Sequence, residues 1–167
     1  MPQTTERALP STLFMQRLPE VLRSHLPEPL QGFKWRARSW LVQIYYGDLA
    51  FHYEVWALPG GKRMELGLHF ESSTRRYNDD LLNAFGERLI EIKAELGGGV
   101  EAEPWDKGWS KVYETMPRET FSHEFLGRVA MRLARIIEVL EPMLRSALSM
   151  LPATVGGGDP DDGQDTA

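Results

Sequence analysis

Two histidines in the first half of the chain have a spacing that could bring their side chains together. His52 and His69 each stand in a run in which apolar and polar residues alternate, as in a half-buried β-strand. If a tight turn at Gly60-Gly61 joins the two runs as an antiparallel hairpin, the two imidazoles lie opposite each other with Cβ atoms roughly 5 Å apart. Such a pair, with carboxylates nearby, could ligate a divalent metal or act as a general acid and base.

The metal interpretation competes with a plainer one, in which His52 and His69 are polar residues on a solvated sheet face. No third ligand stands at a dedicated spacing, and no nucleophile or oxyanion donor can be assigned to an acid–base pair. The motifs of phosphate-binding loops, zincins and serine hydrolases are also absent. The sequence therefore predicts no catalytic residue, no metal centre and no cofactor, and a metal-dependent hydrolase that uses His52 and His69 is kept as an alternative.

The alternating runs around these histidines predict a three-stranded antiparallel meander over residues 35–71. Gly47-Asp48 and Gly60-Gly61 are dipeptides that favour two-residue hairpin turns. With these turns, Val55 on the middle strand lies opposite Trp40 on one side and opposite Leu66 on the other. Both hairpins then turn the same side of the middle strand inward, and a one-residue slip in either would break that agreement.

The opposite face of the meander is the predicted working surface. On it Gln43, His52 and His69 form one row across the three strands, and Glu54 lies in the next row. The whole predicted binding surface mixes polar with apolar side chains and consists of Leu41, Gln43, Tyr45, His52, Glu54, Trp56, Glu65 and His69. Its large apolar members indicate either a contact site for a partner or a region covered by another segment of the same chain.

Helical periodicity predicts three helices around the meander, over residues 11–26, 78–96 and 122–148, with Asn78 and Ser122 as N-caps of the last two. A second hairpin is predicted over residues 100–115. The fold class is therefore α+β, an antiparallel sheet with helices packed on one face in the order α-βββ-α-ββ-α. We expect a single domain over residues 11–151, a flexible N-terminus over 1–10 and a disordered acidic tail over 152–167.

Composition narrows the function classes. The chain has 167 residues, a formal net charge of −5 and no cysteine, which excludes disulfides, thiolate metal sites and cysteine nucleophiles. Four of the acidic residues stand in the tail, so the rest of the chain is nearly neutral and does not demand a polyanionic partner. No apolar run is long enough to cross a bilayer, and the first ten residues do not look like a signal peptide. We expect a cytoplasmic protein without a membrane partner.

A row of arginines on the last predicted helix suggests a second surface. Arg128, Arg132 and Arg135 follow one another at helical spacing and could contact nucleic acid. Charged rows of this kind are also common on the solvated face of a helix, and Glu124 and Glu138 interrupt this one. Nucleic acid is therefore a possible partner but not the favoured one.

The predicted order of elements over residues 11–150, the small size and the acidic isoelectric point together resemble the class I chaperones of type III secretion. Those chaperones are dimers that wrap an extended segment of a client protein. The resemblance implies a non-enzymatic protein that binds other proteins and forms a homodimer.

The run from Tyr77 to Pro142 is similar to an uncharacterised bacterial domain family found C-terminal to restriction-endonuclease-like nucleases. The similarity lies in a helix with Leu81-Leu82, Leu89-Ile90 and Glu95-Leu96-Gly97, in a strand that ends at Trp105, and in a closing helix that ends at Glu141-Pro142-Met143-Leu144. The opening α-βββ-α-β order also matches the nuclease core, which needs an Asp on one strand and Glu-x-Lys on the next. The matching positions are Glu54-Val55-Trp56, Glu65-Leu66-Gly67 and His69-Phe70-Glu71, and they offer no lysine.

The leading hypothesis is a non-enzymatic protein-binding or assembly module, a homodimer in the bacterial cytoplasm, that acts through the outer face of the 35–71 meander. An accessory nucleic-acid-associated domain of a nuclease or defence system, with a degenerate nuclease core, is the first alternative.

Overall fold

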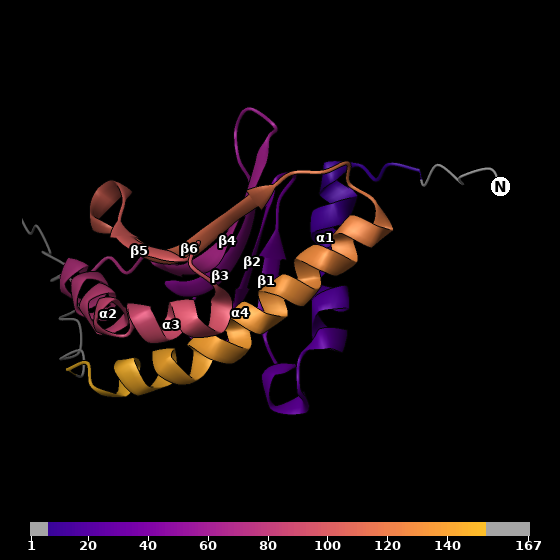
Figure 1. The fold of residues 1–167 in the computed structure, drawn as a ribbon. Helices are drawn as coiled ribbons and strands as arrows, with labels where there is room; N and C mark the ends of the chain where they lie inside the picture. The colour runs from indigo at the N-terminus through magenta and orange to yellow at the C-terminus, as the bar shows by residue number, and fades with distance from the viewer. Residues whose placement is uncertain (1–6, 153–167) are drawn as a thin grey trace, which may run out of the picture.

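A six-stranded antiparallel sheet with helices against one face makes up the part of the chain that the structure, a computed structural model, describes, residues 7–152 (Figure 1). The strands lie in the order β1-β2-β3-β4-β6-β5. They comprise β1 (Lys34–Ala37), β2 (Leu41–Tyr45), β3 (Phe51–Ala57), β4 (Arg63–Phe70), β5 (Glu101–Pro104) and β6 (Ser110–Pro117). The α+β class and the antiparallel sheet are confirmed.

The helices follow the predicted order with one division. They are α1 (Ser11–His25), α2 (Arg75–Glu87), α3 (Leu89–Leu96) and α4 (His123–Ser149), with 3₁₀ turns η1 (Glu28–Leu30) and η2 (Asp106–Gly108). The helix predicted over residues 78–96 is two helices that meet at Arg88. The first strand of the predicted meander is likewise two strands, β1 and β2, joined by residues 38–40. The predicted 100–115 hairpin is present as β5 and β6, and β6 also pairs with β4.

The β3–β4 hairpin has the predicted register. Gly61 N–H donates to the Leu58 carbonyl at 3.3 Å, so Pro59 and Gly60 are at the centre of the turn, and Gly60 and Gly61 have left-handed φ values of 94° and 73°. Leu58 N–H donates to the Arg63 carbonyl 3.0 Å away and closes the turn. His52 therefore lies opposite His69.

The β2–β3 hairpin differs from the prediction by two residues in register. Gly47 is not among the glycines with positive φ, and the Asp48 carboxylate instead accepts from Ala50 N–H at 2.8 Å, which builds a longer loop. Gln43 consequently lies opposite Glu54, not His52. A shift of two residues keeps every side chain on its predicted face, because side chains alternate with period two.

One residue at the start of β2 does leave its predicted place. Trp40 was predicted to point inward opposite Val55, but it stands in the bend before β2 and is 49% exposed. Its carbonyl accepts from Ala57 N–H at 2.9 Å, while Val55 pairs with Val42.

The core lies between the sheet and the helices. Leu66 and Val55 on the inner face are fully buried, as predicted, and the buried side chains of α1 and α4 pack with them. These helix side chains include Phe14, Leu18 and Leu22 of α1 and Val129, Leu133 and Ile137 of α4. One polar pair crosses this core, because the Tyr53 hydroxyl donates to Glu141 Oε2 at 2.8 Å.

The two predicted caps have different outcomes. Ser122 caps α4 as predicted, and its hydroxyl accepts from Phe125 N–H at 3.0 Å. Asn78 is not a cap, because α2 begins three residues earlier at Arg75. Its buried side-chain amide donates to the carbonyls of Ser72 and Gly108 and so holds α2 against η2.

Apart from Pro152, the predicted tail lies outside the described residues, and so do the first six residues of the predicted flexible N-terminus. Within residues 7–152, no helix has the length and apolar character needed to cross a membrane.

Close approach of β6 to β4 requires a glycine at position 67. A Cβ built there would lie 2.6 Å from the Cβ of Tyr113 and would also strike the Val112 carbonyl oxygen. We expect Gly67→Ala to lower the free energy of unfolding by about 1–3 kcal/mol, the usual cost of overpacking. The measurement is urea denaturation followed by circular dichroism.

The matched control is Gly127→Ala on α4, where an added Cβ meets nothing within 4 Å. Alanine is the better helix former, so this variant should be as stable as the wild type or up to about 1 kcal/mol more stable. A Gly67→Ala protein with wild-type stability would show that β4 and β6 do not lie this close together.

Candidate functional site

The sheet face that points away from the helices carries a buried cluster of hydrogen-bonding and charged side chains. Seven residues from four strands and the end of β4 form it, and we call them the polar cluster: Gln43, His52, Glu54, Glu65, His69, Glu71 and Lys111. His52 is 1% exposed and His69 is fully buried. The centre of this sheet face is therefore covered by other parts of the chain and is not a solvated surface.

His69 is held between two carboxylates. Its Nε2 lies 3.2 Å from Glu65 Oε1, and its Nδ1 lies 3.1 Å from Glu71 Oε1. Burial by itself would lower the pKa of His69, but the hydrogen bonds to Glu65 and Glu71 outweigh it and raise the pKa to about 9. Because carboxylate oxygens accept hydrogen bonds, an imidazolium with a proton on each nitrogen satisfies both contacts.

Glu65 is stabilised as an anion by the same contacts. Burial alone would raise its pKa, yet hydrogen bonds from His69 and Lys111 hold the pKa below its ordinary value. Lys111 Nζ donates to Glu65 Oε2 at 2.9 Å. Glu54 behaves alike: burial alone would raise its pKa, but the charge of His69 and a hydrogen bond from Gln43 hold the pKa below its ordinary value.

His52 has a defined orientation. Its Nδ1 lies 2.8 Å from the Leu49 carbonyl oxygen, which can only accept, so Nδ1 carries a proton. Its Nε2 lies 3.0 Å from the side-chain nitrogen of Gln43 and 3.3 Å from Glu54 Oε2. Arg36 donates to Gln43 Oε1, which identifies the other atom of that amide as the nitrogen and leaves Nε2 of His52 as an acceptor.

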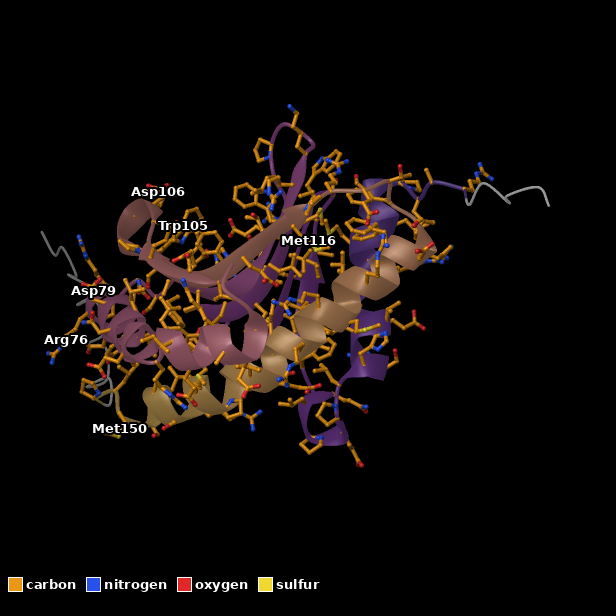
Figure 2. All side chains as sticks on the ribbon, viewed as in Figure 1. Arg76, Asp79, Trp105, Asp106, Met116 and Met150 are labelled. Atoms are coloured by element: carbon orange, nitrogen blue, oxygen red, sulfur yellow. The ribbon has the colours of Figure 1, made fainter. Side chains whose placement is uncertain are left out.

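Trp105 covers the β6 side of the polar cluster. Its ring lies 5.6 Å from the His69 ring, edge to face, and Lys111 Nζ lies 5.1 Å from its centroid. Figure 2 shows Trp105 on the connection between β5 and β6, on the side of the sheet away from α3 and α4. The indole Nε1 of Trp105 is buried and has no hydrogen-bond partner, and among the described residues it is the only buried side-chain nitrogen or oxygen in this state.

Lys111 and Glu71 are the cluster members that the predicted surface lacked. Lys111 could have been found from the alternation of the second hairpin, but only if β6 had been paired with β4. Lys111 lies beside Glu65 but comes from β6, opposite His69, and not from the strand of Glu65.

The remaining predicted surface residues lie at the margins. Leu41 pairs with Trp56 across β2 and β3, and both are half-buried, as is Tyr45. Trp56 also lines a groove of about 430 Å³ at the end of the β3–β4 hairpin. Its other lining residues are Trp40, Ala57, Leu58, Pro59, Gly60, Gly61 and Arg118.

The predicted arginine row is neutralised by acids. Arg128 pairs with Glu119 and Glu124, Arg132 with Glu114, and Arg135 with Glu95 and Glu138. Arg132 also donates to the Leu96 carbonyl, so it joins α4 to the end of α3. These contacts do not favour a nucleic-acid interface, because the phosphate backbone would have to compete with carboxylates already in place.

The raised pKa of His69 predicts a specific pH dependence of stability. The folded protein holds the proton up to about pH 9, whereas an ordinary histidine loses it near 6.5, so this stabilisation is complete below pH 6.5 and is lost as the pH rises to 9. We expect the free energy of unfolding to fall across this interval by at most about 1.4 kcal/mol per pH unit.

Urea denaturation at several pH values in EDTA-containing buffer measures this slope. His69→Gln should flatten it, whereas His25→Ala, which changes an exposed histidine of α1, should leave it unchanged. A wild-type curve that is level between pH 6.5 and 9 would contradict the paired arrangement of His69.

Comparison with known proteins adds no relative to this picture: no protein-family model matches the chain, and neither the curated proteins nor the solved structures contain a significant match.

Proposed function

We propose that this protein is a non-enzymatic protein-binding module whose contact site is the aromatic groove at the end of the β3–β4 hairpin. The observation that carries the proposal is the exposure of Trp40, 49%, beside Trp56 in a groove of about 430 Å³. Tryptophan is enriched at the energetic centres of protein interfaces, since it buries a large area at a small entropic cost.

The groove lies where the outer face of the sheet ceases to be polar. The polar cluster satisfies its hydrogen bonds internally, so it has little to offer a partner. Leu41 and Trp56, at the other end of the same face, are half-buried, and their side chains are largely apolar. The binding function is therefore assigned to this end, and not to the whole of the predicted surface.

Arg118 gives the groove a polar rim. Its guanidinium carbon lies 5.0 Å from the centroid of the Trp40 ring and 4.5 Å from that of Phe121. It thus restrains Trp40 and leaves a positive charge at the edge of an apolar surface, the composition of a protein contact site. Pro59 and Gly61 belong to the hairpin tip that projects beyond the body of the molecule in Figure 1.

The partner we propose is an extended protein segment with apolar side chains. A groove of about 430 Å³ accepts a few side chains at a time, as grooves for extended and proline-containing peptides do. The resemblance to chaperones that wrap extended clients supports the same class of partner. A homodimer, in which a second copy supplies the segment, is a form of the same proposal.

The test is the affinity of peptides selected from a random library displayed on phage. Trp40→Ala should weaken the binding of a selected peptide by about 30-fold or more, which corresponds to roughly 2 kcal/mol, because the ring forms one wall of the groove. Trp35→Ala is the matched control, since Trp35 is 43% exposed on β1 but does not line the groove.

Sedimentation equilibrium of both variants and the wild type examines self-association in parallel, with circular dichroism as the measure of folding. The proposal fails if the folded Trp40→Ala protein binds peptides and itself as tightly as the wild type does, or if the wild type is a monomer for which no peptide is selected.

A further inference from the structure

We propose that the polar cluster is a binding site for a divalent transition-metal ion, with zinc as the expected occupant. His52, His69 and Glu71 each offer a ligand atom, and these three atoms lie within 4.8 Å of one another. The proposed ligands are Nε2 of His52, Nδ1 of His69 and Oε1 of Glu71, the atoms that face one another in the structure. The function of this site is separate from that of the aromatic groove.

The distances are close to those of a coordination sphere. Glu71 Oε1 lies 3.1 Å from His69 Nδ1 and 4.0 Å from His52 Nε2. Ligands placed about 2.0–2.1 Å from a tetrahedral zinc ion are separated by roughly 3.3 Å. The Glu71–His69 pair is already close to this separation, whereas His52 is too far away. To bind the ion, His52 must move toward His69, whose ring centroid lies 5.4 Å from its own.

Each imidazole is oriented for coordination by the group on its far nitrogen. The Leu49 carbonyl accepts from Nδ1 of His52 at 2.8 Å and leaves Nε2 for the metal. Glu65 Oε1 lies 3.2 Å from Nε2 of His69 and leaves Nδ1 on the side of Glu71. Metal-bound histidines almost always have such a carbonyl or carboxylate behind them, which fixes the tautomer and raises the basicity of the ligand nitrogen.

Charge balance also favours a divalent cation. The three carboxylates of Glu54, Glu65 and Glu71 face the single ammonium group of Lys111. A divalent ion held by two neutral imidazoles would make the cluster neutral. Neutrality matters here because an uncompensated charge in a buried site is costly.

Two neighbouring side chains, Gln43 and Glu54, must adapt when the ion binds. The Gln43 amide gives up its contact with His52 Nε2 but keeps its bond to Glu54 Oε2, 2.9 Å away. Glu54 Oε2, 3.3 Å from His52 Nε2, is the nearest fourth ligand. Entry is from the side of Glu71, whose side chain is 17% exposed.

The ligand set selects the class of ion. Two imidazoles and a carboxylate suit zinc and its first-row neighbours, whereas magnesium and calcium prefer oxygen ligands. A buried site of this kind, with its ligands on β3, β4 and the residue after β4, holds these strands together.

The experiment uses the full chain after treatment with a chelator. Calorimetric titration with ZnCl₂ should give one ion per chain, and MgCl₂ should give no saturable heat. In imidazole ¹H–¹⁵N spectra, the signals of His52 and His69 should shift on zinc addition while those of His25 and His123, the other two histidines, stay in place. The melting temperature should rise.

Variants that retain side-chain shape identify the ligands. Glu71→Gln should weaken zinc binding at least tenfold, and Glu65→Gln, a change in a positioning residue behind His69, should weaken it by about 10–100-fold. Glu28→Gln, an exposed control, should bind as the wild type does. Circular dichroism confirms folding.

The proposal is overturned if the wild type shows no saturable zinc binding up to about 100 μM, roughly 5.5 kcal/mol of binding free energy. It is equally overturned if zinc shifts only His25 or His123, or if a folded Glu71→Gln protein binds zinc with wild-type affinity.

Discussion

The contacts of His69 with Glu65 and Glu71 constrain the rest of the sheet, because they place charged groups among the strands and away from water. A buried ion costs several kcal/mol unless it is paired and hydrogen-bonded. Lys111 is therefore needed beside Glu65, and β6 must lie close to β4 to bring it there. Gly67, which has no side chain between these strands, permits that approach.

This constraint divides the outer face into two regions of different chemical character. Its centre is a closed network in which the donors and acceptors of His52 and Glu54 are already occupied, so it suits a small cation better than a protein. The end around Trp40 and Trp56 is apolar and open, and it suits a protein segment. The inner face has neither role, because its side chains form the core.

Much of the fold could be predicted from local signals. Gly60-Gly61 indicated the position of one hairpin, and with it the His52–His69 pair, because both glycines have the positive φ that other residues rarely adopt. The other hairpin was misplaced because the side chain of Asp48 forms a local hydrogen bond that a dipeptide rule does not include. Lys111 was missed for a different reason: β4 and β6 are adjacent in the sheet but separated in sequence by two helices, and no local pattern reports such a pairing. The position of Trp105 over the polar cluster was missed for the same reason, because it depends on the pairing of β6 with β4.

The protonation state of the two buried histidines tests the central claim most directly. We expect ¹⁵N spectra of the metal-free protein at about pH 7.5 to show His69 protonated on both ring nitrogens, because two carboxylates face it and its pKa is raised to about 9. The same spectra should show His52 with its proton on Nδ1, toward the Leu49 carbonyl. A neutral His69 at that pH, with ring protons that exchange rapidly with water, would mean that the polar cluster is open to solvent and would contradict the account.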